Sequence, residues 1–310
     1  MSINVTYATD NRNGIITAIF ESPDGNATLL NGTNSLKTTI NGEPTIATKA
    51  IIGRGIKIIG DKAFYQATSL TSIYIPDGVT TIGASAFLDA ISLTSIIIPA
   101  SVTTIGDSAF INAKSLTSIN IPYGITTIAN STFGNTGLTS ITIPDSVTTI
   151  GVTAFTNTKL TSVIIPSSVK IIGKSAFSIH SLTSVTISPG VSIIDEYAFI
   201  MTGLTSVIIP SSVTTIGEQA FGGVTSLKTV YIEKIPNNLG LIESSNVEFY
   251  GAINVTIKLI SSNDVSNTTL STGAIVGISI GSVVALVGII YGIVFFLKKQ
   301  KINKKFINKK

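Results

Sequence analysis

The 310-residue sequence contains no cysteine, no tryptophan and a single histidine, His180. The absence of cysteine excludes disulfide bonds and metal sites built on thiolates. One histidine and no cysteine also argue against transition-metal ligation and against a Cys–His or Ser–His catalytic pair. No phosphate-binding G-x-x-x-x-G-K-[ST] loop is present, and the carboxylates are scattered without a recurring acidic pair. We therefore expect no enzymatic activity, no cofactor and no metal site, and we interpret His180 as a solvated residue of a connecting loop.

Charged side chains are scarce, at 12% of the residues, and they are unevenly distributed. Seven of the twenty basic residues lie in 298–310, whereas all sixteen acidic residues lie in 1–264. The first 272 residues therefore carry thirteen basic and sixteen acidic side chains, which is a net charge of −3. A nucleic-acid-binding domain concentrates Lys and Arg to neutralise phosphates. This distribution argues against a nucleic-acid partner.

One phrase recurs along most of the chain, as in LTSIIIPASVTTIGDSAF at 93–110 and LTSITIPDSVTTIGVTAF at 138–155. The Phe that closes each phrase comes seventeen positions after the Leu that opens it, and a connector of four or five residues follows. A period of 22–23 residues is the signature of a leucine-rich-repeat solenoid, in which stacked coils share one apolar core. The opening leucines are Leu70, Leu93, Leu116, Leu138, Leu160, Leu182, Leu204 and Leu227, and the closing phenylalanines are Phe64, Phe87, Phe110, Phe133, Phe155, Phe177, Phe199 and Phe221.

Each phrase divides into two halves with different backbone preferences. The first half, L-T-S-I-x-I-P, alternates inward apolar and outward residues, which predicts a short β-strand that ends at the proline. The second half, x-S-V-T-T-I-G-x-x-A-F, predicts an extended segment, a glycine turn and one turn of α- or 3₁₀-helix. Asp61, Asp107 and Asn130 follow the glycine position and are residue types that cap helix N-termini. A degraded phrase at 47–64 brings the expected total to about nine coils.

Residues 273–297, GAIVGISIGSVVALVGIIYGIVFFL, contain no charged residue. A helix of this length, at about 1.5 Å per residue, spans a hydrocarbon core of about 30 Å with some tilt. The lysines that follow predict that 298–310 is cytoplasmic and that the repeats lie outside the cell. Small residues at G-x-x-x-G spacing predict lateral homo-association of this helix. They are Gly273, Gly277, Gly281, Gly288 and Gly292.

The expected fold is therefore a leucine-rich-repeat solenoid, a β-rich α/β horseshoe of about nine 22–23-residue coils, followed by one transmembrane α-helix. Solenoids need caps that cover their terminal coils, and off-period β-like segments flank the repeats. The expected organisation is an N-terminal β-rich cap at 1–46, repeats at 47–235, a C-terminal cap at 236–264, a short stalk at 265–272, the transmembrane helix at 273–297 and a basic cytoplasmic tail at 298–310.

The phrase LTSIxIPxSVTTIGxxAF resembles the BspA-like, or treponemal-type, leucine-rich repeats over roughly 47–235. Proteins of that family are typically surface proteins of bacteria and of mucosal protozoan parasites. The resemblance implies adhesion to host cells, to host matrix or to other microbes, and it does not imply catalysis. This sequence departs from the pattern at Ser188 in place of Pro, at Ala129 and Asp195 in place of Gly, and at Glu233 in the last unit.

The outward positions of the predicted strands form two columns on the concave sheet. Ser fills the first column almost throughout, whereas the second column varies and carries aromatic and aliphatic side chains. A strip of exposed apolar residues marks interaction sites, so we expect a protein or glycan ligand at the second column. Ordinary β-propensity is the alternative explanation for these residue types. The second column consists of Tyr74, Ile97, Asn120, Thr142, Ile164, Thr186, Ile208 and Tyr231.

Two features leave the location of the repeats open. The N-terminal sequence MSINVTYATDN shows neither the basic nor the apolar stretch of a signal peptide, which also fits a tail-anchored protein on an internal membrane. The repeats would then be an intracellular scaffold. The lysine flank and the family resemblance favour the cell surface. Six N-x-[ST] sequons precede the apolar segment, at Asn4, Asn26, Asn31, Asn130, Asn254 and Asn267, about as many as this composition gives by chance.

Paired threonines suggest a remote alternative, an ice-binding array. The pairs are Thr80–Thr81, Thr103–Thr104, Thr126–Thr127 and Thr148–Thr149. Because apolar core residues flank the pairs, we expect one Thr of each pair to turn partly inward. The array also breaks at Lys170–Ile171.

Overall fold

The computed structural model divides the chain into two compact units, Met1–Ser262 and Asn263–Lys310. The second unit lies outside the described residues, and with it the expected stalk, transmembrane segment, glycine spacing and tail. Within the described part, no helix is long and apolar enough to cross a membrane. The structure describes residues 4–10, 15–21, 27–29, 37–40, 43–53, 55–233 and 244–260.

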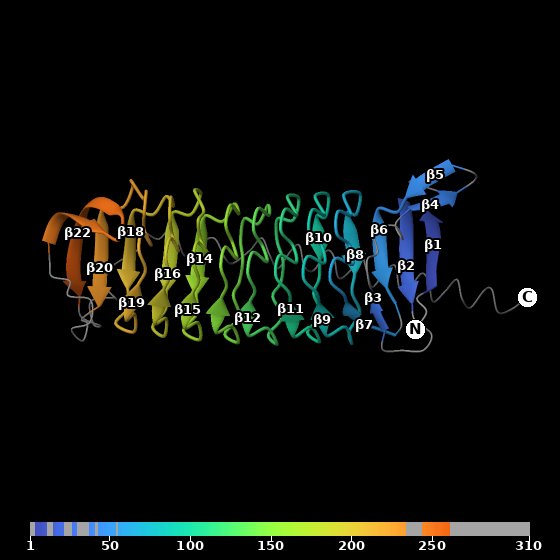
Figure 1. Ribbon diagram of the computed structural model, residues 1–310, viewed down its shortest axis with the longest axis horizontal. Coiled ribbons are helices and arrows are strands. Elements are labelled where there is room, and N and C mark those ends of the chain that lie inside the picture. The colour runs from blue at the N-terminus through green and yellow to red at the C-terminus, as the bar shows by residue number, and fades with distance from the viewer. Residues whose placement is uncertain are drawn as a thin grey trace, which may run out of the picture. The chain divides into compact units, whose positions relative to one another are not determined.

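The coils of the first unit stack side by side, and each coil contributes a short strand to a front face, to a back face or to both (Figure 1). Pairing is not continuous along either face: among the described residues, the back-face strands form two separate parallel sheets and the front-face strands belong to three sheets. The two faces are called the front sheet and the back sheet. The L-T-S-I-x-I segments build the front sheet, because their alternation places one apolar set inward. The T-T-I segments build the back sheet with strands of two residues in most coils. The front-sheet strands are β6 (Lys49–Ile52), β8 (Ser72–Tyr74), β10 (Ser95–Ile96), β14 (Ser162–Ile165), β16 (Ser184–Ile187), β18 (Ser206–Ile209) and β20 (Thr229–Glu233). The back-sheet strands are β7 (Ile56–Ile59), β9 (Thr81–Ile82), β11 (Thr104–Ile105), β12 (Thr127–Ile128), β13 (Thr149–Ile150), β15 (Ile171–Ile172), β17 (Ile193–Ile194) and β19 (Thr215–Ile216).

A ladder of phenylalanines runs through the core from coil to coil. The closing Phe of each coil is fully or almost fully buried. Neighbouring rings from Phe64 to Phe221 stack with centroids 5.2–5.8 Å apart. Stacked aromatic pairs at this distance add to the free energy already gained by burying the rings. No coil could bury its own Phe, so the ladder is what makes the array one folding unit.

The expected helical turn after the glycine is wrong: in the described part the chain has no helix, so the α/β description of the coils is also wrong. Successive turns form a turn ridge instead. Ala63 N–H donates to Gly60 O of its own coil (3.2 Å), whereas Phe64 N–H donates to Ala86 O of the next coil (2.7 Å). This alternation repeats in successive coils and requires left-handed backbone at two positions four residues apart in most of them, as at Lys62 (φ 58°) and Gln66 (φ 56°). An α-helix would direct every N–H along its own axis and leave none for the neighbouring coil.

The residues expected to cap those helices act between coils. The Asp61 Oδ1 accepts a hydrogen bond from Ala84 N–H (2.7 Å), and the Asp107 Oδ1 accepts one from Asn130 N–H (3.0 Å). The Asn130 Oδ1 in turn accepts from Val152 N–H (2.9 Å). Each side chain thus satisfies a backbone donor of the following coil, and the capping interpretation is wrong.

The front sheet is interrupted, contrary to the expectation of a strand in every coil. Among the described residues, the front segments at 118–121 and 140–143 form no strand. The Asn120 Nδ2 donates to Ile98 O (2.8 Å) and its Oδ1 accepts from Ile98 N–H (3.1 Å). The side-chain amide therefore takes both backbone groups of Ile98 that a neighbouring strand would use.

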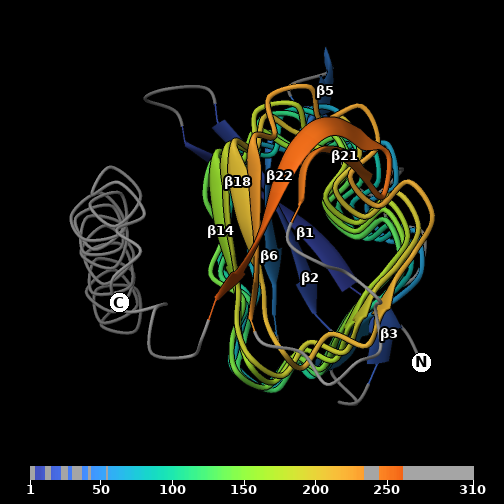
Figure 2. The ribbon, with the colours of Figure 1, turned by 90° about the vertical axis from the view of Figure 1, so that its left-hand side faces the viewer.

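Extra strands lie against both terminal coils. At one end β2 (Ile15–Glu21) runs parallel to β6, and the Phe20 ring meets the Phe64 ring edge-on at 5.6 Å. At the other end β22 (Ala252–Ile260) runs parallel to β20, and the Phe249 ring lies 5.4 Å from the Phe221 ring. Figure 2 shows the coils end on, with β14, β18 and β22 on one side and the back-sheet strand β3 (Ala27–Leu29) on another. The remaining strands of the unit are β1 (Asn4–Asp10), β4 (Lys37–Ile40), β5 (Glu43–Ile46) and β21 (Ser244–Phe249).

Candidate functional site

The variable column of the front face is exposed at most of its positions. Tyr74, Ile97 and Ile164 have exposed fractions of 45%, 39% and 51%, although all three are large apolar side chains. Their exposure follows from the pleat, because the residues on either side of each point into the core. Thr186 is also exposed, whereas Ile208 and Tyr231 are half-buried.

The strand register places members of this column opposite one another on neighbouring strands. Ile164 lies opposite Thr186, and Ile208 lies opposite Tyr231. The column also extends beyond the predicted residues, because Tyr231 lies opposite Lys258, whose Nζ sits 5.9 Å from the Tyr231 ring centroid. At the other end, Ile51 lies opposite Tyr74. A cation over a ring face is attracted to the ring, so Lys258 is a neighbour of Tyr231 that the column did not include.

The middle of the column does not join its two ends. Asn120 is exposed, but its amide is committed to the Ile98 backbone, and Thr142 lies in the front segment without a strand. The column therefore splits into one apolar patch at Tyr74 and Ile97 and a second patch from Ile164 to Tyr231. Asn is depleted in strands, and its appearance at a strand position was the signal for this break.

Tyr123 is an exposed aromatic residue that the column analysis missed. Its exposed fraction is 70%, and it follows Pro122 at the corner between the front segment and the back sheet. In this repeat Tyr-Gly stands after the proline, where the common phrase has x-Ser, and this replacement was the sequence signal for an exposed aromatic residue at the corner. The corner position lies next to the interruption in the front sheet.

Two of the four threonine pairs differ from their predicted orientation, whereas Thr81 and Thr149 of the other two pairs are half-buried, as expected. Thr103, Thr104, Thr126 and Thr127 are all exposed, so the expectation that one of each pair turns inward is wrong for these two pairs. The inward positions belong to Ile105 and Ile128, which follow the pairs. The first hydroxyl of a pair donates to the carbonyl of the preceding coil, as from Thr148 to Thr126 O (3.1 Å) and from Thr80 to Lys57 O (3.3 Å).

Asp195 and the charged side chains beside it form contacts within the fold. The Asp195 Oδ1 accepts from Glu196 N–H (2.7 Å), and Glu196 forms an ion pair with Lys174 at 2.6 Å. The hydrogen bond from Lys174 to Glu196, together with the carboxylate charge, raises the pKa of Lys174. His180 is exposed in its connector. Within the described residues, no group of three His, Cys, Asp or Glu side chains could hold a metal ion.

Comparison with known proteins identifies the repeat. Residues 45–160 and 148–271 match the family model of the BspA type leucine rich repeat region, with six copies. A comparison with curated proteins finds no match.

Several solved structures are similar to the chain. A leucine rich cell surface protein from Faecalibacterium prausnitzii is 24% identical, with 86% of this chain and 97% of that chain covered and a TM-score of 0.47. The leucine rich repeat protein of T. pallidum is 22% identical, with 72% and 87% covered and a TM-score of 0.47. The pneumococcal vaccine antigen PcpA is 18% identical, with 84% and 87% covered and a TM-score of 0.39. Because the family model spans most of the sequence, the chain belongs to the BspA-type leucine-rich repeat family.

Proposed function

We propose that this chain is a cell-surface binding protein whose repeats hold a protein or glycan partner against the front face. Repeats of this family generally serve as binding scaffolds without catalytic activity. The observation that carries the proposal is the set of exposed apolar side chains at Tyr74, Ile97 and Ile164 on an otherwise polar, weakly charged face. Exposed apolar residues gathered on one face are typical of interaction sites.

The spacing of the coils sets the minimum length of a partner that contacts both apolar patches. The coils hold the outward side chains at a spacing of about 4.8 Å, so Tyr74 and Ile164, four coils apart, are separated by about 19 Å. A partner that contacts both patches must cross the segment that carries Asn120 and Thr142. Its contacts would be distributed over several similar coils, so each single substitution should have a small effect.

A combined substitution tests the binding face. Tyr74, Ile97, Ile208 and Tyr231 are replaced together with Ser in the full chain, which removes apolar contact area and leaves the inward core residues unchanged. A matched control replaces four exposed apolar residues of other faces with Ser: Ile91, Val152, Ile171 and Met201. We expect the first variant to lose most binding to cells, matrix proteins or glycans and the control to keep it. Equal binding by both variants would place the site elsewhere, and no binding by the wild type would refute adhesion.

We further propose that 273–297 is a single-pass membrane anchor and that 298–310 lies in the cytoplasm. We also propose that the membrane helices of two chains pair through the G-x-x-x-G glycines. The competing arrangement is a tail-anchored intracellular scaffold that uses the same front face. A tag at the N-terminus of the full chain, expressed in intact eukaryotic cells, separates the two. Staining and cleavage of the tag from outside support the surface arrangement. Protection of the tag, together with unglycosylated sequons, would place the repeats in the cytosol.

A second candidate function, ice binding, is favoured by one observation: both residues are exposed in two successive threonine pairs on the back sheet. Thermal hysteresis of the purified full chain tests it. A freezing gap that disappears when Thr104 and Thr127 become Lys would support ice binding, and the absence of any gap would remove this candidate.

A further inference from the structure

Asn254 opens the sequence Asn254-Val255-Thr256, which has the N-x-[ST] form of an N-glycan acceptor. It lies on β22, next to the edge strand β21 in the order β18-β20-β22-β21, at the end of the stack that faces the viewer in Figure 2. The chain has five other sequons. Among them, only that of Asn130 has an asparagine side chain within the described residues.

A β-bulge directs the Asn254 side chain outward. The register between β21 and β22 shifts at this point, where Ile253 and Asn254 together face one residue of β21. Asn254 has left-handed backbone there (φ 58°), a conformation that Asn tolerates better than most other residues. Ala252 and Val255 are buried, whereas the two residues between them are exposed. The bulge therefore breaks the alternation of the strand and presents Asn254 to solvent.

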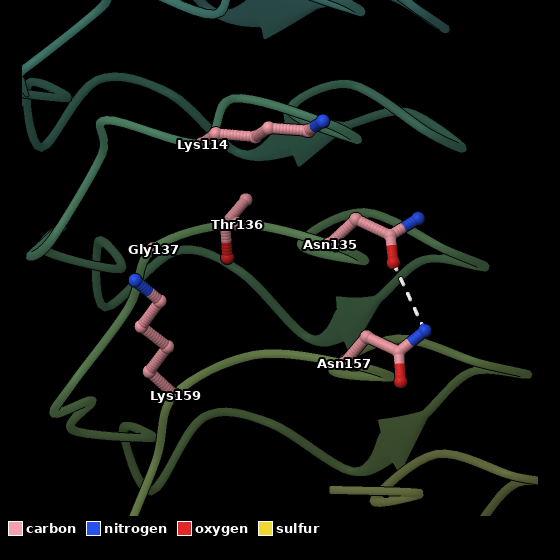
Figure 3. A pocket seen from close by; sticks show the side chains of 6 residues that line it. All are labelled: Lys114, Asn135, Thr136, Gly137, Asn157 and Lys159. Atoms are coloured by element: carbon pink, nitrogen blue, oxygen red, sulfur yellow. Dashed lines mark hydrogen bonds between the residues drawn. The ribbon is translucent and has the colours of Figure 1, made fainter.

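The Asn254 carboxamide is not used by the described fold. Other asparagine side chains bond between coils, and Figure 3 shows one such bond, from Asn157 Nδ2 to Asn135 Oδ1 (3.1 Å). Among the asparagine side chains that the structure describes, that of Asn254 alone has no hydrogen bond to another described residue. The hydroxyl of half-buried Thr256 is also unbonded in that part of the chain. A glycan on the Asn254 Nδ2 would therefore break no hydrogen bond of the described fold.

Asn130 differs from Asn254 in each of these respects. Its Oδ1 accepts from Val152 N–H (2.9 Å), and its Nδ2 lies 3.5 Å from the Asp107 Oδ2 of the preceding coil. Thr132, the third residue of this sequon, is 1% exposed, and its hydroxyl donates to Ala129 O (2.8 Å). The acceptor motif requires a hydroxyl residue at this position. Folding of the coil therefore withdraws Asn130 from a transferase, whereas folding leaves Asn254 accessible.

We propose that Asn254, and not Asn130, carries an N-linked glycan, an inference that rests on the proposed position of the repeats outside the cell. In the transfer, the Asn254 Nδ2 would attack the anomeric carbon of a lipid-linked oligosaccharide. A C–N bond forms as the bond from that carbon to the diphosphate oxygen breaks, the lipid diphosphate leaves, and one Nδ2 proton passes to a base of the transferase. The glycan would cover Ile253, which is 63% exposed beside the edge strand. Exposed sheet edges need such protection from pairing with other chains.

Glycopeptide mass spectrometry of the full chain tests the assignment. The chain, with an N-terminal tag that contains its own sequon, is expressed in eukaryotic cells and digested with trypsin. Cleavage at lysines gives the peptides 235–258 and 115–159, which contain the sequons of Asn254 and Asn130 and no other sequon. Release of glycans with N-glycosidase in heavy-oxygen water labels each asparagine that carried one. We expect the label on most copies of 235–258 and on almost no copies of 115–159.

Two substitutions in the sequon and a matched control test the acceptor itself. Asn254→Asp keeps a residue type that tolerates left-handed backbone but removes the amide. Thr256→Ala removes the hydroxyl, so both variants should lose the label on 235–258. The control, Thr256→Ser, retains the hydroxyl and should retain the label. Labelling of 235–258 that persists in Thr256→Ala would contradict enzymatic transfer to this sequon.

The sequon of the tag separates failure of this inference from failure of the surface arrangement. A labelled tag with an unlabelled 235–258 would overturn the assignment of Asn254 and leave the surface arrangement intact. Equal labelling of 235–258 and 115–159 would show that the fold does not select between the two sequons, which also overturns the inference. An unlabelled tag together with an unlabelled 235–258 would overturn both the inference and the surface arrangement.

Discussion

Single residues of the turn ridge adopt left-handed backbone although they are not glycine. Asn112, Asn135 and Asn157 have φ of 62°, 56° and 56°. Asn tolerates this region better than other non-glycine residues. Their side chains also bond between coils, as from Asn112 Nδ2 to Asp89 Oδ1 (2.8 Å). The same residue thus supplies both the turn conformation and a contact to the preceding coil.

Two substitutions at Asn112 separate these contributions. Asn112→Ala introduces backbone strain and removes the hydrogen bond, so we expect a loss of about 2 kcal/mol in the free energy of unfolding. Asn112→Gly removes the hydrogen bond without strain and should cost about 1 kcal/mol. Urea denaturation followed by circular dichroism measures both. If the Gly variant is as unstable as the Ala variant, the left-handed backbone is not the source of strain.

Tyr250 makes the C-terminal end of the Phe ladder sensitive to alkaline pH. Its carbonyl accepts from Phe221 N–H (3.0 Å), and its ring packs edge-on against Phe249 at 5.0 Å. Burial raises the pKa of the Tyr250 phenol above its usual value of 10.0. The folded state then retains the proton longer than the unfolded state does, so this stabilisation is complete below pH 10 and is lost as pH rises through the higher folded pKa.

Tyr250→Phe keeps the backbone bond and the ring contact but cannot ionise. We expect the urea midpoint of the wild type to fall more steeply above pH 10 than that of the variant, whereas the two should change in parallel between pH 6 and 9. Parallel curves over the whole range would show that Tyr250 has the same pKa in both states.

At the level of elements, threonine hydroxyls strengthen the very short strands of the back sheet. Thr148 uses both its N–H (2.8 Å) and its hydroxyl (3.1 Å) to donate to Thr126 O. A net contribution of about 1 kcal/mol is typical of such a hydrogen bond. We expect Thr148→Val to lower stability by about this amount in urea denaturation. The neighbouring Thr149, with no side-chain hydrogen bond among the described residues, supplies the control, since Thr149→Val should be neutral. Equal effects at both positions would contradict this role of the hydroxyl.

The strands were predictable from sequence because their cause is local. Alternation in L-T-S-I-x-I specifies which side chains face inward, and Leu70 and Ile73 are buried while Tyr74 is exposed. The turn ridge was not predictable in this way, since x-x-A-F fits one helical turn equally well. The choice depends on whether Phe64 N–H bonds within its coil or to Ala86 O, 22 residues away. Only the stacked neighbour decides between these two partners.

The candidate site was also predictable from the sequence only where its cause is local. Exposure of the variable column followed from strand period alone, and Tyr74 and Ile164 are exposed as predicted. The break at Asn120 did not follow, because it arises from one side chain that binds the backbone of the preceding coil. Contacts between coils therefore determine where the face is continuous and where it is interrupted.

For the repeat unit as a whole, hydrogen-bond direction makes inner coils interchangeable. At the starts of the strands, N–H groups donate to the preceding coil, as from Thr94 N–H to Thr71 O (3.0 Å). On the ridge it donates to the following coil, as from Phe87 N–H to Ala109 O (2.7 Å). Most inner coils therefore present a similar pattern of backbone donors and acceptors to each neighbour, with Ile98 as an exception because its N–H and carbonyl bond to the Asn120 side chain. We expect coils that follow the common pattern to be interchangeable.

Deletion of one complete coil tests this equivalence. Removing 138–159 joins Gly137 to Leu160, brings Phe133 next to Phe177 and restores the bond to Thr126 O with Lys170 N–H in place of Thr148 N–H. We expect the shortened chain to fold with the same far-ultraviolet circular dichroism per residue and to melt only slightly earlier, because stability in stacked repeats is nearly a sum over neighbouring pairs. Removing 138–148 deletes half a coil and places strand residues against the ridge, so that chain should be degraded by protease under conditions that spare the full-coil deletion. Equal protease resistance of both deletions, or collapse of both, would show that the coils are not interchangeable units.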